Sequence, residues 1–151
     1  MIHGDCLELL DQCAPCSIDA AITDPPYGCR HGCTGFAHET NFNMQSDLNK
    51  DFGNLPDFQV FLSHMAEVGR KVRRILKPRG YFILIIGDRF YQGEYVPLGA
   101  EIAACIKKTG FKLKGIKIWS NRATVRPYRP YGMYHCFVPN ITHQNIIILQ
   151  K

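Results

Sequence analysis

The stretch Ser17-Ile18-Asp19-Ala20-Ala21-Ile22-Thr23-Asp24-Pro25-Pro26-Tyr27 decides the fold of this chain. Residues 17–24 form a short apolar run, and Pro25-Pro26 stops it. Proline has no backbone N–H for a strand ladder, and it forces the residue before it out of helical geometry. The run therefore predicts a buried strand that ends abruptly in a rigid loop. Before it, we expect an opening strand at residues 1–4 and a short helix around Leu7–Leu10.

The pattern changes to a helical one after a long stretch without any period. Residues 28–55 predict a long loop. From Pro56 to Leu76, apolar residues recur at three- and four-residue steps, which predicts an amphipathic helix that ends before Pro78. Residues 81–87 then form a continuous apolar run, which is typical of a strand covered by helices on both faces.

The last third of the chain continues this alternation of helix and strand. We expect a helix from Pro97 to a cap at Gly110, a strand over 111–119 with a bulge at Gly115, an irregular segment over 120–143 and a closing strand over 145–149. The 151 residues, 46% hydrophobic, suit one domain. The alternation predicts an α/β sandwich over residues 1–151, with a mostly parallel sheet whose strand ends supply the site.

The charge balance favours an anionic partner. The formal net charge is +5, from 18 Lys and Arg against 13 Asp and Glu. Two segments are candidates for nucleic-acid contact, and each has a structural alternative. The predicted helix carries Arg70, Arg73 and Arg74, which could equally form a solvated face. A proline-rich loop carries Arg126, Tyr128, Arg129 and Tyr131, which could equally cover the core.

The seven cysteines do not suggest a disulfide framework, because their number is odd and no secretory signal precedes them. The pairs Cys13/Cys16 and Cys29/Cys33, with His31 between the second pair, invite a zinc hypothesis. Their spacings differ, so we expect reduced thiols and no metal. The absence of a long apolar run predicts a soluble, cytoplasmic protein.

Four segments resemble the DNA N6-adenine/N4-cytosine amino-methyltransferases, in the permuted order of one subgroup. Asp24-Pro25-Pro26-Tyr27 after a buried strand is similar to the catalytic signature of that family. The other three segments are residues 2–7, residues 76–80 before the next strand, and residues 143–151. The resemblance implies a partial Rossmann-like fold, S-adenosyl-L-methionine as cofactor and a site-specific DNA methyltransferase. The expected target is the N6 amine of a flipped adenine.

The chemistry of that reaction explains these residue types. An exocyclic amine is a poor nucleophile until acceptors hold both its hydrogens, which the Asp24 carboxylate and the Pro25 carbonyl can do. Pro26 helps to fix the loop, and Tyr27 would stack on the flipped base. The resemblance also implies that Asp5 and Asp24 border the cofactor. Asp5 fits a helix N-cap equally well. His143 would orient the loop, or simply pack.

One family element is missing from this sequence. No glycine-rich turn of the F-x-G-x-G type is present to let the backbone approach the methionine end of the cofactor. The domain is therefore expected to be incomplete at its cofactor-binding half. A second polypeptide or self-association would complete it, or the chain is an inactive remnant. An RNA base methyltransferase and a non-catalytic nucleic-acid-binding module stay open as alternatives.

Overall fold

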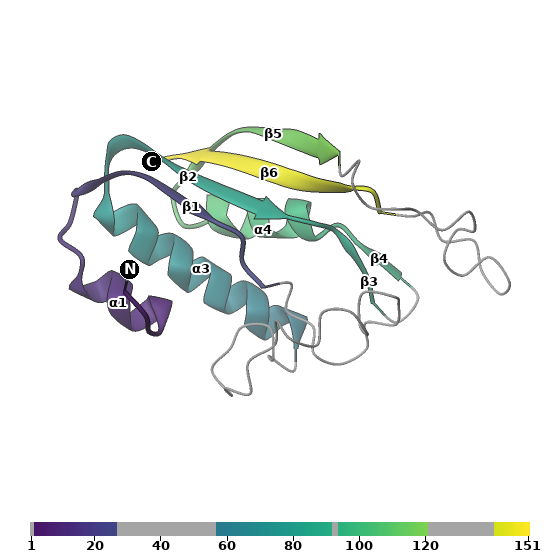
Figure 1. Ribbon diagram of the computed structural model, residues 1–151, viewed down its shortest axis with the longest axis horizontal. Coiled ribbons are helices and arrows are strands. Elements are labelled where there is room, and N and C mark those ends of the chain that lie inside the picture. The colour runs from purple at the N-terminus through teal and green to yellow at the C-terminus, as the bar shows by residue number, and fades with distance from the viewer. Residues whose placement is uncertain (1, 27–56, 92–93, 121–140) are drawn as a thin grey trace, which may run out of the picture.

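The computed structural model describes residues 2–26, 57–91, 94–120 and 141–151. In this part of the chain, a four-stranded sheet carries three helices on one face, and a two-stranded ribbon lies beyond its end (Figure 1). The helices are α1 (Cys6–Gln12), α3 (Phe58–Ile75) and α4 (Leu98–Lys107). The strands are β1 (Ile18–Thr23), β2 (Leu76–Ile86), β3 (Arg89–Tyr91), β4 (Glu94–Val96), β5 (Lys112–Ser120) and β6 (His143–Gln150). The predicted α/β class is confirmed.

The four strands of the sheet lie in the order β1-β2-β6-β5. β1 pairs with β2 in parallel, whereas β6 is antiparallel to both of its neighbours. β1, β2 and β5 therefore point in one direction and β6 opposes them. We expected a mostly parallel sheet, and three of its four strands do point in one direction. Two of the three pairings are nevertheless antiparallel, so the sheet is mixed. The reason is that β6 begins beside the end of β5, with His143 opposite Ser120, and must run back along it.

The core lies between the helices and the sheet face that they cover. α3 begins where the Asp57 carboxylate accepts the Gln59 N–H at 3.0 Å, which satisfies one of the unpaired donors of the first turn. Its apolar side buries Phe61 and Met65 against β2, where Leu84 is fully buried. This confirms the helix that the three- and four-residue periodicity predicted, and it fixes the position of the sheet relative to α3.

The connection from α3 to β2 is tighter than the sequence suggested. Leu76, expected at the end of the helix, is already extended and is the first residue of β2. The chain then leaves the β1–β2 register, and Lys77 binds both carboxylate oxygens of Asp19 on β1, at 2.9 and 3.0 Å. A Cβ at Gly80 would lie 2.9 Å from the carbonyl oxygens of Asp19 and Lys77. A glycine is required there because the two backbones come so close.

The described helices cover the sheet on one face (Figure 1). On that face Leu84 and Ile86 are fully buried, whereas Ile83 and Ile85, which point the other way, are half-buried and Ile22 is 66% exposed. We call the second face the outer face. Its apolar side chains include Ile22, Tyr81, Ile83, Ile85, Ile146, Ile148 and Trp119. The expectation that helices cover β2 on both faces is therefore wrong for the described residues, because α3 and α4 pack on the same side.

The remaining sequence expectations have mixed outcomes. The opening strand at residues 1–4 is wrong: residues 2–4 pair with no described strand, and Ile2 is 80% exposed. The helices at α1 and α4 are confirmed. Gly110 follows α4 with a φ of 99°, in the left-handed region that suits glycine after a helix. The register of β5 against β6 shifts between Leu113 and Gly115, which confirms the predicted bulge.

We expect Gly80→Ala to destabilise the fold, because its methyl group would press on two backbone carbonyl oxygens that cannot turn away. Overpacking of this kind costs about 1–3 kcal/mol. At roughly 2–4 °C per kcal/mol for a chain of this size, thermal unfolding should detect it. Gly115→Ala is the matched control, since a Cβ there has no atom within 4 Å. A midpoint as high for Gly80→Ala as for Gly115→Ala would contradict the close approach of β1 and β2.

Candidate active site

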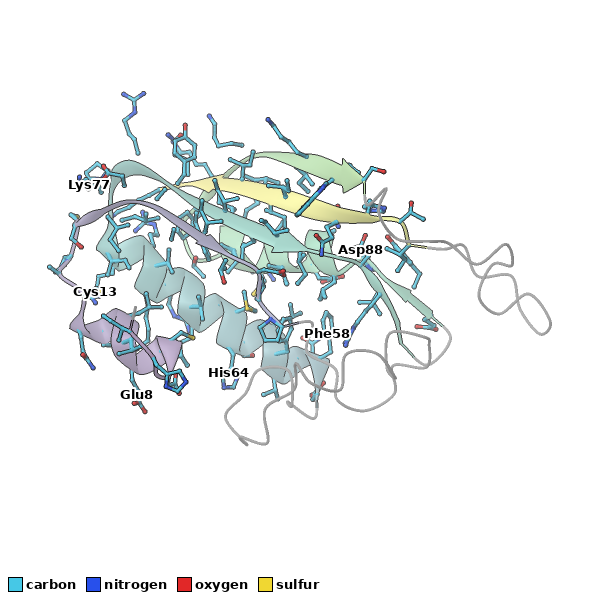
Figure 2. All side chains as sticks on the ribbon, in the orientation of Figure 1. Glu8, Cys13, Phe58, His64, Lys77 and Asp88 are labelled. Carbon is cyan, nitrogen blue, oxygen red and sulfur yellow. The ribbon has the colours of Figure 1, made fainter. Side chains whose placement is uncertain are left out.

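Several segments meet at the edge of the sheet where β1, β2 and β5 end, which we call the rim. β6 begins there, since Asn145 lies opposite Ile86. The first turn of α3 reaches the same edge, because the Arg89 guanidinium lies 5.4 Å from the centre of the Phe58 ring. Figure 2 shows Phe58 and Asp88 at this end of the molecule. In open α/β sheets, ligands bind beyond the carboxyl ends of the strands. The rim is therefore where a site is expected, and the Asp24 loop opens onto it.

Asp24, Pro25 and Pro26 follow directly on the last residue of β1. Pro25 is buried, whereas Asp24 and Pro26 are exposed, so the loop is anchored by its central proline. Partial loss of solvent around the Asp24 carboxyl raises its pKa above its usual range. Tyr27 lies outside the described residues. The described part of the loop thus presents a carboxyl group at the rim on a backbone that proline holds stiff.

A second carboxyl group at the rim, Asp88, is buried and connects three other segments. Its side chain, 8% exposed, follows β2. Oδ1 accepts the Gly99 N–H of α4 at 2.9 Å and the Asn145 side-chain amide of β6 at 3.1 Å. Oδ2 accepts the Tyr95 hydroxyl of β4 at 2.6 Å. A buried carboxylate needs such donors, and these bonds fix α4, β4 and β6 against the end of β2.

Tyr95 and His143 face the same carboxylate. The hydrogen bond to Asp88 is the largest cause that raises the pKa of Tyr95 to about 12, so its hydroxyl keeps its proton at neutral pH. His143 Nε2 lies 3.7 Å from Asp88 Oδ2, close enough for an ion pair when the imidazole is protonated. The sequence suggested that His143 orients the active-site loop. The structure places it at the rim beside Asp88, and the orienting role stays a prediction.

Sequence reasoning did not find Asp88, Tyr95 or Asn145. One signal was present: Asp88 is the first charged residue after the apolar run of residues 81–87, at the carboxyl end of a buried strand. Its donors come from segments 7, 11 and 57 residues further along the chain. No local pattern shows that these segments meet.

The proline-rich loop with Arg126, Tyr128, Arg129 and Tyr131 lies outside the described residues. The residue before the undescribed segment, Ser120, ends β5 at the rim. β5 points in the same direction as β1. The segment that carries the four residues therefore leaves the sheet at the same edge as the Asp24 loop. The prediction that these residues lie beside a bound nucleic acid depended on this arrangement of the two strands.

The three arginines of α3 make contacts within the molecule. Arg74 donates to the Leu10 carbonyl at 2.7 Å, Arg73 donates to the Gly110 carbonyl at 3.3 Å, and Arg70 pairs with Glu67. They belong to the second half of α3, which ends where β2 begins, opposite the rim. Arg70 therefore lies on a solvated face of α3, whereas Arg73 and Arg74 bind neighbouring segments, and nucleic-acid binding by these residues stays a prediction.

Asp5 is the N-cap of α1, with Oδ1 accepting the Leu7 N–H at 2.8 Å. The predicted contact of Asp5 with a cofactor stays a prediction. Gly99, a glycine at the rim, offers no cradle for a ligand, because a Cβ there would lie 2.6 Å from the Asn145 side-chain nitrogen. Its missing side chain makes room for Asn145. Gly99 therefore does not supply the glycine-rich turn that the sequence lacks.

The described cysteines are Cys6, Cys13, Cys16 and Cys105, and none of them is in a disulfide. Among the described residues, no group of three or more possible metal ligands gathers. Cys29, His31 and Cys33 of the zinc hypothesis lie outside that part. No described helix is long and apolar enough to cross a membrane, and the cytoplasmic location stays a prediction.

Comparison with solved structures defines the class of this fold. A suspected DNA modification methylase of Thermus thermophilus is 24% identical and matches with a TM-score of 0.65, over 98% of this chain and 50% of its own. The same protein in complex with S-adenosyl-L-methionine matches at 25% identity and a TM-score of 0.64, over 98% and 51%. The PvuII cytosine-N4-specific DNA methyltransferase is 16% identical, with a TM-score of 0.65 over 97% and 47%. The fold is that of an S-adenosyl-L-methionine-dependent methyltransferase.

The family follows from the sequence match. A family model described as DNA methylase, for N6 and N4 methyltransferases, matches residues 18–151, so the chain belongs to the DNA methylase family. This confirms the resemblance carried by the Asp24-Pro25-Pro26-Tyr27 loop. The chain spans about half the length of the solved structures it matches.

We expect Asp88→Asn to lower the pKa of Tyr95 from about 12 toward its ordinary value of 10.0, because a neutral amide accepts the hydroxyl more weakly than a carboxylate. The phenolate absorption of the folded protein reports this titration, and the difference from Tyr95→Phe isolates Tyr95 from the other tyrosines. Asp19→Asn, which removes an exposed carboxylate at the opposite end of the sheet, should leave the titration unchanged. An unaltered Tyr95 titration in Asp88→Asn would show that this hydrogen bond does not form in solution.

Proposed function

We propose that this chain is the catalytic half of a site-specific, S-adenosyl-L-methionine-dependent DNA methyltransferase that acts on the exocyclic amine of a flipped base. The expected target is adenine N6. The observation that carries the proposal is the position of Asp24-Pro25-Pro26 at the carboxyl end of β1, in a chain of the DNA methylase family. Two of the structural neighbours support it, one of them bound to S-adenosyl-L-methionine and the other a cytosine-N4-specific enzyme.

In this proposal, residues of the Asp24 loop bind the amine of the target base. Asp24 accepts one amine hydrogen and the Pro25 carbonyl accepts the other, which draws the nitrogen toward tetrahedral geometry and directs its lone pair at the methyl donor. The buried ring of Pro25 keeps both acceptors in place. Tyr27 stacks on the flipped base. S-adenosyl-L-methionine, when bound, supplies an electrophilic methyl group.

The DNA contacts that we propose come from the loop after β5. Arg126 and Arg129 would bind phosphates, and Tyr128 and Tyr131 would stack on bases. The exit of this loop at the rim supports that assignment. Arg70, Arg73 and Arg74 are less favoured, because Arg73 and Arg74 bind carbonyl groups of other segments and Arg70 pairs with Glu67 of the same helix. The family match and the DNA methylases among the structural neighbours favour DNA over RNA as the substrate.

We further propose that a second polypeptide completes the cofactor site. Two observations support this: the sequence has no glycine-rich turn of the expected type, and the outer face is apolar without a described helix over it. Self-association through the outer face is less favoured. Lys112 and Lys117 of β5 share that face, so two copies stacked with β5 over β5 would bring like charges together.

Asp24→Ala should lower methyl transfer by on the order of 100-fold or more while the fold is kept, because it removes one acceptor of the reacting amine. The measurement is the incorporation of radiolabelled methyl into DNA by the chain together with the polypeptide that completes it. Asp19→Ala, in the same strand but at its other end, is the control and should stay active. A folded Asp24→Ala variant with full activity would remove Asp24 from the mechanism.

The pH dependence of methyl transfer should show the raised pKa of Asp24. Only the carboxylate accepts the amine hydrogen, so activity is present above the pKa and is lost as the pH falls through it. Because partial desolvation raises this pKa above the ordinary 3.8, the acid limb should lie at a higher pH than a solvated aspartate would give. An acid limb at or below the ordinary value would contradict the environment described for this carboxyl.

Replacing Arg126 and Arg129 together by alanine should weaken DNA binding about equally across sequences. Each lost phosphate contact should also flatten the dependence of affinity on salt, with the slope of log K against log salt falling by roughly 0.9 on duplex DNA. Titrations at several salt concentrations measure both effects. The matched control is the Arg70→Ala, Arg73→Ala double variant. If the Arg70→Ala, Arg73→Ala variant flattens the dependence of affinity on salt and the Arg126→Ala, Arg129→Ala variant does not, the phosphate contacts belong to α3.

A further inference from the structure

The positive charge of this chain is concentrated in its last third. Residues 102–151 contain nine Lys and Arg and no Asp or Glu, which gives a formal charge of +9. Residues 1–101 contain nine Lys and Arg against 13 Asp and Glu, which gives a formal charge of −4. The net charge of +5 is therefore the sum of two parts of opposite sign. An asymmetry of this kind indicates a polyanion as the partner of the positive part.

In the part of this segment that the structure describes, much of the charge lies along β5, the edge strand of the four-stranded sheet (Figure 1). Lys112, Lys114 and Lys117 are exposed, and we call them the β5 lysines. Lys112 and Lys117 share the outer face, and Lys114 is the extra residue of the bulge. The neighbouring strand β6 contains no Asp, Glu, Lys or Arg, so it does not offset this charge.

The β5 lysines are not neutralised within the described part of the chain. None of the three forms an ion pair with a described carboxylate. Two lysines of other elements differ in this respect, because Lys71 pairs with Asp11 and Lys77 pairs with Asp19. The charge of the β5 lysines therefore stays available for an external anion.

Protection of the sheet edge explains why β5 is charged, but it does not explain the sign of the charge. Charged side chains on an edge strand hinder pairing with another chain, and glutamate serves this purpose as well as lysine does. A strand with positive charges alone selects an anionic partner, either a nucleic acid or an acidic polypeptide. Lysine is depleted at protein–protein interfaces, whereas it is a usual ligand of phosphate groups. The β5 lysines therefore favour a nucleic acid.

The β5 lysines form a row that leads to the rim. Ser120, the last residue of β5, lies at the rim, three residues beyond Lys117 and eight beyond Lys112. At roughly 3.3 Å per residue, the row covers about 15 Å of the strand. Phosphates of one DNA strand repeat about every 3.4 Å along the helix axis, so several of them can face the row. DNA whose target base enters at the rim can therefore place its flanking backbone along β5.

We propose that the β5 lysines form a second DNA-binding surface, which binds phosphates of the duplex that flanks the target base. The inference rests on the proposed function, because it takes DNA as the ligand. It adds contacts on a regular strand, outside the Asp24 loop and the proline-rich loop. Phosphate contacts carry no sequence information, so the β5 lysines contribute affinity and fix the orientation of the duplex without selecting the site.

Anisotropy titrations of a fluorescein-labelled DNA duplex of mixed sequence, at several salt concentrations, test this surface. The Lys112→Gln, Lys117→Gln double variant should flatten the slope of log K against log salt by roughly 1.8, because each lost phosphate contact contributes roughly 0.9. At about 0.15 M salt, this change corresponds to roughly 30-fold weaker binding. Lys112→Gln alone should flatten the slope by about half as much.

Lys77→Gln is the matched control for Lys112→Gln. It removes the same charge by the same substitution, but Lys77 already has Asp19 as its partner, so the salt dependence should stay that of the unaltered chain. An unchanged slope in the folded double variant would overturn this inference alone and leave an acidic polypeptide as the partner of the β5 lysines. An equal change in Lys77→Gln and Lys112→Gln would also overturn it, because net charge would then be the cause. If the unaltered chain binds no DNA, the proposed DNA contacts and this inference both fall.

Discussion

The parallel pairing of β1 with β2 is the constraint on which the rest of the structure depends. It brings the ends of two strands to one edge, so that the Asp24 loop and the segment that leads to Asp88 leave the sheet at the same edge. At the other end of the two strands, the carbonyl oxygens of Asp19 and Lys77 lie so close to Gly80 that a Cβ at this position would not fit. The Lys77–Asp19 ion pair joins the same two strands there. Loss of this pairing would separate the two carboxyl groups of the rim.

The two carboxyl groups are held in opposite ways, and this suits different tasks. Asp88 is buried and accepts three hydrogen bonds, so its charge serves to fix α4, β4 and β6 around the rim. Asp24 is exposed on a loop stiffened by a buried proline, and solvent loss raises its pKa. A group that must accept hydrogens from a ligand needs an accessible position, whereas a group that organises the surrounding segments needs donors from all of them.

Local patterns predicted much of the fold and part of the site. The strand before Pro25, the helix α3 and the bulge at Gly115 are each encoded within a few neighbouring residues, and the structure confirms them. The predicted burial of the strand before Pro25 is wrong for the described residues: no residue of β1 is buried, because β1 lies at the edge of the described sheet. The Asp88 cluster was beyond such reasoning, because its donors meet only in the folded chain. The one-sided cover of the sheet was also not predicted. The run at residues 81–87 is apolar on both faces of the strand, and such a run does not reveal which elements cover each face.

The apolar outer face, which no described helix covers, and the absence of a glycine-rich turn from the sequence are both consistent with the architecture that we propose, in which this chain binds the amine and another polypeptide binds the methyl donor. The most direct measurement is the transfer of radiolabelled methyl from S-adenosyl-L-methionine to DNA or RNA, by this chain with and without a candidate cofactor-binding polypeptide, with the modified nucleoside identified. We predict label in DNA, at an exocyclic amine and expected at adenine N6, only when both polypeptides are present. Label in RNA alone, or label at a ring carbon, would contradict the account.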